Sequence, residues 1–349
     1  MRPAPLADAL RSRVPRGRAL ALTLGALVAA GVGSGAAIAS TSAAPIGTGV
    51  VVIRTTLGYQ SGSAAGTGMV LTSSGEVLTN NHVIRGATTI RVVVPATSRT
   101  YTATVVGYDM TDDVAVLQVA GASNLKTVST ADSSTLATGS PVTALGNAGG
   151  TGRLASATGT ITRLRQSIVV NDDQGGAIRL SGLIGTNASV EPGDSGGPLL
   201  NSAGDVIGMD TAASTGPAFR STTATVGYAI PISKALAIER QVVSGNATTR
   251  IHLGKTPFLG VQIASELGRG PSSAGAVVEG VVSGGPAASA GLASGDVITA
   301  IDGHAISSSR SITSVILAEK LGATVTITYT HQFGGSLSTT ATLAVGPPQ

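Results

Sequence analysis

Residues 193–198, with the sequence GDSGGP, are the segment of this 349-residue chain that says most about its fold. A serine between glycines suits a nucleophile, because the missing side chains let a substrate carbonyl approach the hydroxyl. The N–H groups of Gly193 and Ser195 can also point together at a developing oxyanion. The alternative is a tight Gly-Pro turn in a chain that has 48 glycines. Residues elsewhere in the chain must decide between the two.

The chain offers one well-placed base for such a serine. It has four histidines, and His82 lies at the end of the strand-like run LTNNHVI at residues 78–84. A ring held there can lie at the edge of a cleft and take the serine proton. The other three are expected to be solvated or merely hydrogen-bonded side chains: His252, His304 and His331.

The base in turn needs a carboxylate on its other ring nitrogen. Asp113 directly precedes the apolar run 114–117, which would carry it to the edge of the core, and Asp112 and Asp109 are its rivals. The order His, Asp, Ser along the chain is that of the chymotrypsin-like double β-barrel, whereas subtilisins have the order Asp, His, Ser. The α/β-hydrolases have the order Ser, Asp, His and a G-x-S-x-G motif, which is absent around Ser195.

The chain after Ser40 agrees with a mainly β fold. Short runs rich in Val, Ile and Thr alternate with turn residues, as in barrels and sandwiches. Strands are expected at 50–56, 67–72, 89–94, 101–108, 114–119, 141–145, 155–164, 199–200, 206–209 and 225–230. A helix is predicted over 233–244 with Ser233 as its N-cap. The boundaries predict a protease-like domain over 46–244, a polar linker over 245–257 and a second domain over 258–349.

The second domain is predicted to be a small α+β barrel. Strands are expected at 258–263, 276–282, 297–301, 324–330 and 337–345, with a short helical piece at 286–290 and a helix at 309–321. Asp302-Gly303 is typical of a β-hairpin turn.

The formal net charge of +4 belongs to the N-terminal tip. Five arginines and Asp8 give residues 1–18 this charge, and the remaining 17 basic and 17 acidic residues balance. The apolar run 19–39 ends in Ala-Ile-Ala, so residues 1–39 have the pattern of a secretory signal peptide, with an uncleaved membrane anchor as the alternative. Either form predicts export, to a secreted or cell-envelope location. No nucleic-acid partner is expected, and the absence of Cys excludes a disulfide scaffold and thiolate metal sites.

Five segments together resemble the HtrA/DegP family of exported, chymotrypsin-like serine proteases. They are GTGMVLTSSGEVLTNNHVI at 66–84, DMTDDVAVLQV at 109–119, VEPGDSGGPLLN at 190–201, VIGMDTAA at 206–213 and VGYAIP at 226–231. The tail from Phe258 resembles that family's PDZ domain. The resemblance implies two six-stranded barrels with the triad His82, Asp113 and Ser195 in the cleft between them. The D-x-x-x-D spacing of the family selects Asp113 over Asp112.

The resemblance also implies binding residues. The primary specificity pocket would suit a small or medium aliphatic side chain, and its walls would come from Ser189, Val190, Thr211, Ala212, Tyr228 and Ile230. The loop Leu259-Gly260-Val261 would bind peptide C-termini through its N–H groups, with the helix at 309–321 as the other wall of the groove. No metal ion or organic cofactor is required. Asp194 and Asp210 stand where the family usually has asparagine, and two carboxylates at the cleft would favour substrates with basic residues.

Two functions are compatible with these residues. The first is an exported serine endopeptidase that hydrolyses peptide bonds of misfolded or extracytoplasmic proteins, with a PDZ domain that binds exposed C-termini. The second is a latent or non-proteolytic, chaperone-like peptide-binding protein gated by a PDZ ligand. Proteins that the chain resembles are often trimers, but the segment before Val50 is short and lacks aromatic residues. A monomer or a homotrimer is therefore expected.

Overall fold

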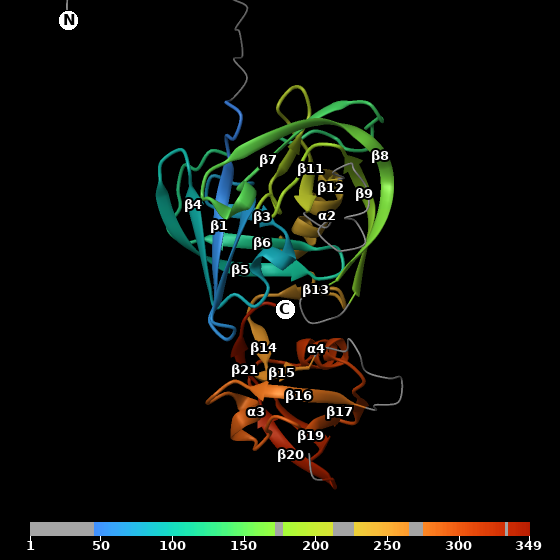
Figure 1. The fold of residues 1–349 in the computed structure, drawn as a ribbon. Coiled ribbons are helices and arrows are strands. Elements are labelled where there is room, and N and C mark those ends of the chain that lie inside the picture. Colours follow the sequence, from blue (N-terminus) through green and yellow to red (C-terminus); the bar gives the residue numbers. More distant parts are fainter. Residues whose placement is uncertain (1–44, 172–176, 212–226, 265–274, 332–333) are drawn as a thin grey trace, which may run out of the picture. The chain divides into compact units, whose positions relative to one another are not determined.

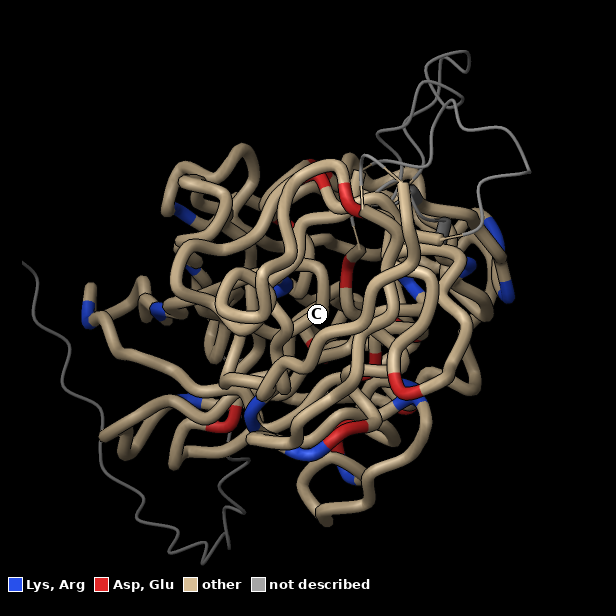
Figure 2. The backbone as a smooth tube through the Cα atoms, turned by 90° about the horizontal axis from the view of Figure 1, so that it is seen from below, with Lys and Arg blue, Asp and Glu red and all other residues tan. Residues whose placement is uncertain are grey.

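The computed structural model describes residues 45–171, 177–211, 227–264, 275–331 and 334–349. These residues form mostly β-strands, arranged as two barrels and a smaller α+β domain (Figure 1). The mainly β architecture predicted from the sequence is confirmed. Charged residues make up 11% of the sequence, and acidic and basic positions are interspersed along the traced chain (Figure 2).

The first barrel is formed by the N-terminal strands. They are β1 (Val50–Leu57), β2 (Gly62–Val70), β3 (Glu76–Thr79), β4 (Thr89–Val94), β5 (Arg99–Asp109) and β6 (Val114–Val119). Their order is β5-β4-β1-β2-β3-β6, and pairing of β5 with β6 closes the sheet. Strand β1 is buried on both faces over residues 50–53: Val51 and Ile53 belong to one core cluster, and Val50 belongs to another that also includes second-barrel residues.

The second barrel is closed by six further strands. They are β7 (Pro141–Gly146), β8 (Ala155–Asn171), β9 (Ala177–Thr186), β10 (Pro198–Leu200), β11 (Val206–Thr211) and β12 (Gly227–Pro231), in the order β10-β11-β12-β9-β8-β7. A short 3-10 helix, η1 (Ala148–Gly150), follows β7. Strand β9 was not among the expected strands, because Arg179, Ser181 and Gly182 interrupt its run of apolar residues.

Helix α2 (Ile232–Val243) contacts β5 and β6 of the first barrel and β11 and β12 of the second. It begins at Ile232, with Pro231 at the N-cap position and no side-chain cap. The predicted N-cap at Ser233 is therefore wrong, and the Ser233 hydroxyl instead bonds to the Ser133 hydroxyl at 2.7 Å.

The segment predicted as a linker, residues 245–257, contains regular structure. Strand β13 (Ile251–Leu253) pairs with the end of β5 as an additional strand of the first sheet. Strand β14 (Thr256–Phe258) pairs with β21 (Ala344–Gly346) near the end of the chain. The edge of β5 accepts this three-residue strand, in which Ile251 is buried and Leu253 packs against the same core cluster.

The C-terminal domain combines a sheet with two helices. Its strands are β15 (Val261–Ile263), β16 (Ala276–Val281), β17 (Val297–Ile301), β18 (His304–Ala305), β19 (Thr324–Thr330) and β20 (Ser336–Thr342), and its helices are α3 (Pro286–Ser289) and α4 (Ser309–Ala318). The order β15-β16-β17-β19-β20 leaves β15 at one edge. Asp302 and Gly303 form the predicted turn, both with positive φ, and Ser308 caps α4 by accepting from the N–H of Ser311.

Candidate active site

His82 and Asp113 are joined through two different parts of the histidine. The carboxylate of Asp113 accepts the backbone N–H of His82 at Oδ1 (2.9 Å), and its Oδ2 lies 2.8 Å from His82 Nδ1. His82 is carried by the one-turn helix α1 (Asn81–Ile84), which follows β3, and its side chain is 44% exposed. Asp113 is 7% exposed. A buried carboxylate therefore orients an accessible ring through one of its two nitrogens.

Two further groups hold Asp113. The side-chain amide of Asn80 donates to its backbone carbonyl at 2.9 Å, and the hydroxyl of Thr211, on β11 of the second barrel, donates to Oδ2 at 3.2 Å. The φ of Asp113 is +56°, a region that few non-glycine residues adopt. Such a backbone conformation costs about 1–3 kcal/mol, and it persists where surrounding contacts determine it, most often at functional sites.

Asp109 and Asp112, the rivals of Asp113, have a different role. Asp109 Oδ1 accepts the N–H groups of Thr111 (2.8 Å) and Asp112 (3.0 Å). These two bonds shape the turn that presents Asp113 to the histidine. Burial is the main cause that raises the pKa of Asp109, against the lowering effect of nearby cations and of the Thr111 N–H.

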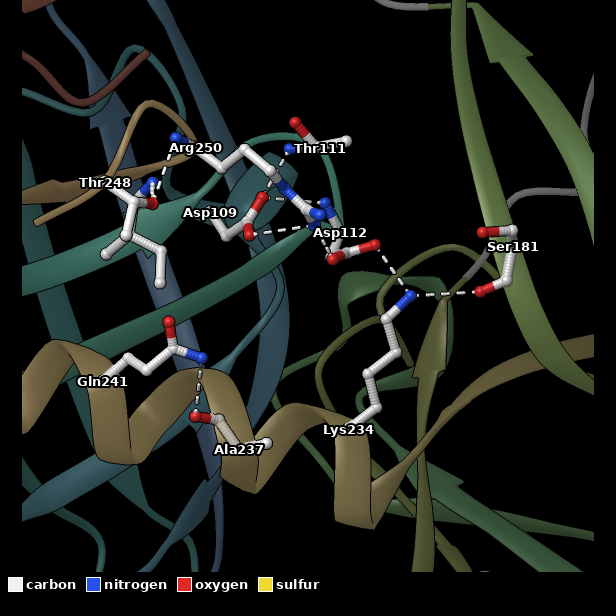
Figure 3. A network of polar contacts seen from close by, with 10 residues as sticks. Asp109, Thr111, Asp112, Ser181, Lys234, Ala237, Gln241, Thr248 and Arg250 are labelled. Carbon is white, nitrogen blue, oxygen red and sulfur yellow. Dashed lines mark hydrogen bonds and ion pairs between the residues drawn. The ribbon is translucent and has the colours of Figure 1, made fainter. Parts of the chain in front are cut away.

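A network of ion pairs holds the outer side of this turn (Figure 3). The guanidinium of Arg250, which precedes β13, pairs with the carboxylates of both Asp109 and Asp112. Lys234 of α2 pairs with Asp112 at 2.7 Å and donates to the backbone carbonyl of Ser181 at 3.1 Å. Asp109 and Asp112 thus attach the turn to α2 and to the segment before β13, while Asp113 holds the ring.

Ser195 lies in a loop before β10 that depends on glycine. Gly193 has φ +101° and Gly196 has φ +84°. A Cβ on Gly193 would lie 2.2 Å from the carbonyl oxygen of Asn147, and one on Gly196 would lie 2.2 Å from that of Thr67. Both distances are far inside van der Waals contact with backbone atoms, so only glycine fits. Ser195 itself is 4% exposed.

The serine loop and the helix that carries His82 both lie against β2. Gly66 on β2 lies between the two: a Cβ there would be 2.7 Å from a methyl group of Val83 in α1 and 3.2 Å from the carbonyl oxygen of Ser195. The structure therefore brings the three residues predicted as a triad, which are far apart in sequence, into one region where the two barrels meet.

Asp194 and Asp210 lie inside the protein, at 4% and 0% exposure. Asp194 Oδ2 accepts the N–H of Glu191 at 2.9 Å, but its Oδ1 and both carboxyl oxygens of Asp210 lack a hydrogen-bond partner within the described ranges. Burial is the main cause that raises the pKa of both groups, and the charge of Asp194 raises that of Asp210 further. The expectation that they attract basic substrate residues finds no support, because neither side chain lies at the surface.

The residues expected at the specificity pocket have mixed positions. Ser189 is exposed, Tyr228 is half-buried and pairs with Thr211 across β12 and β11, Val190 and Ile230 are buried, and Ala212 lies outside the described residues. Ile230 is 1% exposed and packs in a core cluster with Met209 and Ile232. Thr211 is also committed elsewhere, because its hydroxyl binds Asp113.

The loop Leu259-Gly260-Val261 lies at a groove of the C-terminal domain. The groove has a volume of about 620 Å³. Its walls include this loop and Ile312 and Ile316 of α4, and the first barrel contributes Leu57, Tyr59 and Arg85 to the same walls. Gly260 has φ +82°, and Leu259 is buried in the domain core. Because β15 is an edge strand, its outer side can accept a further strand. The groove therefore has the backbone edge and the apolar wall that an extended peptide requires.

The remaining histidines are hydrogen-bonded or exposed, as predicted. His331 Nδ1 lies 2.8 Å from Asp296 Oδ1, His252 Nε2 lies 3.2 Å from the carbonyl oxygen of Lys255, and His304 is exposed. Among the described residues, no cluster of three or more His, Asp or Glu side chains could hold a metal ion. In the same part of the chain, no helix has the length and apolar character needed to cross a bilayer.

Sequence reasoning missed the positioning roles of three residues that hold the site. Asn80 and Thr211 bind Asp113, and Thr67 on β2 contacts the serine loop. Asn80 and Thr67 lie in the segment 66–84 that carries the resemblance, but no spacing rule connects a threonine in a strand with a loop about 130 residues later. Thr211 was expected as part of the pocket wall.

The fold and the site define a trypsin-like double β-barrel domain followed by a PDZ domain. Residues 66–209 match the trypsin-like peptidase domain family, and residues 257–343 match the PDZ domain family. Serine protease PepD of Mycobacterium tuberculosis is 32% identical over 86% of this chain and 65% of its own length. The serine protease Do-like HtrA of Lactococcus lactis subsp. cremoris is 34% identical over 76% of this chain and 68% of its own.

The chain belongs to the HtrA/Do-like family of serine proteases. It spans about two thirds of the length of these curated relatives. Among solved structures, the HtrA-type protease AlgW with a tripeptide covers 86% of this chain and 95% of its own, at 29% identity and a TM-score of 0.49.

Proposed function

We propose that this protein is an exported serine endopeptidase that hydrolyses peptide bonds of misfolded or extracytoplasmic proteins. In this proposal Ser195 is the nucleophile, His82 the general base and Asp113 the residue that holds His82. The observation that carries it is the pair of bonds between His82 and the two carboxylate oxygens of Asp113. Membership of a family of serine proteases supports the same reaction.

The proposed reaction follows the order of a Ser-His-Asp hydrolase. Ser195 Oγ attacks the scissile carbonyl while His82 takes its proton, and the N–H groups of Gly193 and Ser195 stabilise the oxyanion. Collapse of the tetrahedral intermediate expels the amine, which takes the proton from His82 and leaves an acyl-enzyme. Water then adds to the acyl carbonyl, again with His82 as base, and releases the acid and free Ser195.

We assign the groove of the C-terminal domain to peptide C-termini. The N–H groups at Leu259, Gly260 and Val261 would cap a terminal carboxylate, and the peptide would add as a strand beside β15. The pocket for the substrate side chain at the cut is proposed to suit small or medium aliphatic groups. Export is proposed from residues 1–39 and is tested by sequencing the N-terminus of the mature protein. A start near residue 40 means cleavage, whereas a start at Met1 means an anchor or no export.

A fluorophosphonate probe tests the protease assignment, because it forms an adduct only with an activated serine. We expect labelling of the wild type at Ser195 and loss of both labelling and turnover of an unfolded substrate in Ser195→Ala. Ser202→Ala, which changes an exposed serine seven positions further on, is the matched control and should behave like the wild type. Unchanged turnover in Ser195→Ala would show that the protease assignment is wrong.

The same probe separates a constitutive enzyme from a gated one. An adduct in resting protein indicates a competent site, whereas an adduct that forms only after a peptide with a free apolar C-terminus is added indicates gating through the groove. A protein that binds unfolded chains but is never labelled would instead be the chaperone-like alternative.

A further inference from the structure

Thr67 makes hydrogen bonds with both sides of the serine loop. Its hydroxyl donates to the carbonyl oxygen of Gly193 at 2.7 Å, and its backbone N–H donates to the carbonyl oxygen of Ser195 at 2.8 Å. Gly193 and Ser195 are the two residues whose N–H groups would form the oxyanion hole. Thr67 is on β2 of the first barrel and is fully buried, at 0% exposure.

The hydroxyl oxygen and the carbonyl oxygen of Thr67 also accept hydrogen bonds. Its hydroxyl oxygen accepts the N–H of Asn147 at 2.9 Å, and its carbonyl oxygen accepts the hydroxyl of Thr79 at 2.7 Å. Asn147 belongs to the loop after β7, and its carbonyl oxygen is the atom that a side chain on Gly193 would strike. One hydroxyl therefore joins two neighbouring loops of the second barrel to a strand of the first.

The surroundings of Thr67 are shaped to receive it. A Cβ on Gly146 would lie 2.9 Å from its Oγ1, one on Gly196 would lie 2.2 Å from its carbonyl oxygen, and one on Gly197 would lie 3.1 Å from its methyl carbon. Three glycines thus leave room for the hydroxyl, the carbonyl and the methyl group of a single residue. Such close packing on all sides fixes the position of the side chain.

We propose that Thr67 is a positioning residue for the oxyanion hole, acting through the carbonyl groups of Gly193 and Ser195. Glycine at 193 can rotate its peptide groups at little cost, so its N–H direction needs an external constraint. The Gly193 N–H belongs to the peptide group shared with Pro192, whose carbonyl oxygen accepts the N–H of Gly149 at 2.8 Å. The Thr67 hydroxyl holds the next peptide group through the Gly193 carbonyl, so the backbone is fixed on both sides of Gly193, and rotation there would break a short buried bond. The inference rests on the proposed function, since it assigns Thr67 to the same reaction.

The test compares three variants with the wild type. Thr67→Val keeps the shape and removes the hydroxyl, and Thr67→Ser keeps the hydroxyl and removes the methyl group. Thr55→Val is the matched control, because Thr55 is a buried threonine on β1 whose hydroxyl bonds to a carbonyl of β2 and does not touch the serine loop. We expect Thr67→Val to lose at least about tenfold in kcat with little change in KM, because one lost oxyanion donor costs about 10²–10³-fold.

Three readouts distinguish positioning from simple stabilisation. Affinity for a peptide boronic acid, which forms a tetrahedral adduct, should fall with kcat in Thr67→Val, and Thr67→Ser should recover most of both. Thr55→Val should lower the melting temperature without changing kcat per labelled site. Equal kcat and boronate affinity in wild type and Thr67→Val would overturn the inference while leaving the protease assignment intact. If Thr67→Val does not fold, Thr67→Ala against Thr67→Ser gives the same comparison, and a wild type without Ser195-dependent turnover overturns both proposals.

Discussion

The two barrels hold their parts of the candidate site in different ways. In the first barrel, each bond at the site comes from or goes to a side chain: the Asp113 carboxylate binds the ring and the backbone N–H of His82, and the Asn80 amide binds the Asp113 carbonyl. Thr211 of the second barrel adds a bond from its hydroxyl to the same carboxylate. In the second barrel, the loop around Ser195 is positioned through its backbone, by glycines and by hydrogen bonds to main-chain carbonyls. The difference matches the proposed work of each part, because a proton carrier needs an oriented ring and an oxyanion hole needs oriented N–H groups.

Each barrel also carries a buried aspartate, and the two differ in their hydrogen bonds. Asp113 has three donors for its two carboxylate oxygens: the N–H of His82, Nδ1 of the same residue and the Thr211 hydroxyl. Asp210 directly precedes Thr211 on β11, yet neither of its carboxyl oxygens has a partner among the described residues. Asp113 and Asp210 thus lie in opposite environments: hydrogen-bond donors surround the carboxylate of Asp113, whereas the carboxyl group of Asp210 has none among the described residues.

The largest expected effect comes from breaking the side-chain arrangement. Asp113→Asn replaces an acceptor with an amide that can donate, so the Nδ1 position of His82 is no longer held in the orientation and tautomer that a base requires. We expect kcat/KM to fall by about 10³–10⁴-fold with little loss of folded protein. The measurement is steady-state hydrolysis of an unfolded protein substrate, with circular dichroism to verify folding.

Asp112→Asn is the control for this substitution. It lies in the same turn but pairs with Arg250 and Lys234 instead of His82. We expect it to keep activity within about threefold, since pairs near the surface contribute about 0–1 kcal/mol. A similar loss in both variants would mean that the turn as a whole, and not the bond from Asp113 to the ring, supports activity.

The next largest effect comes from breaking the backbone arrangement. In Gly193→Ala the new Cβ would meet the carbonyl oxygen of Asn147 at 2.2 Å, so the peptide must rotate and its N–H must leave the oxyanion position. We expect kcat to fall by about 10²–10³-fold. Gly182→Ala is the control, because Gly182 also has positive φ (+75°) but no atom within 4 Å of the added Cβ. It should lose about 1–2 kcal/mol of stability and no activity per folded molecule.

Much of this arrangement could be predicted from the sequence. The strand pattern and the glycines beside Ser195 can be recognised in short stretches of sequence. The order of His82, Asp113 and Ser195 along the chain indicates the double barrel, and the structure places these three residues in one region. The role of Thr67 could not be predicted, because an ordinary strand threonine acquires its contacts only when two barrels meet. Strand β13 was missed for a similar reason: its three residues, Ile251–Leu253, are too few to form a recognisable pattern, and the pairing with β5 makes them a strand.

Burial bears on two expectations that came from the resemblance. Asp194 and Asp210, which stand where the family usually has asparagine, were expected near the cleft, and Ile230 was expected at the pocket. All three side chains are buried. A sequence shows the chemistry of a side chain but does not show on which face of a strand a barrel closes.

The smallest expected effect sharpens the contrast between the two aspartates. Burial raises the pKa of Asp210 well above its usual range, and the charge of Asp194 adds to this. The backbone N–H of Leu145 opposes the shift without reaching hydrogen-bonding geometry to either oxygen. The folded state therefore keeps a proton that the unfolded state releases above its ordinary pKa of about 3.9, so the contribution of Asp210 to stability falls as pH rises from there towards the folded pKa.

Asp210→Asn removes this proton and its pH dependence while keeping the size of the side chain. We expect the free energy of unfolding of the variant, relative to the wild type, to increase between pH 5 and pH 8 by about 1 kcal/mol or more, since each pH unit between the two pKa values contributes about 1.4 kcal/mol. Urea unfolding of both proteins at several pH values measures this difference in the free energy of unfolding. The pH dependence of all other titratable groups is the same in both proteins and cancels. Asp132→Asn is the control: Asp132 is exposed, and hydrogen bonds from Ser134 lower its pKa, so its difference should not rise with pH. A pH-independent difference for Asp210→Asn would mean that Asp210 is ionised in the folded protein, and a cation or donor near it would then have to be found.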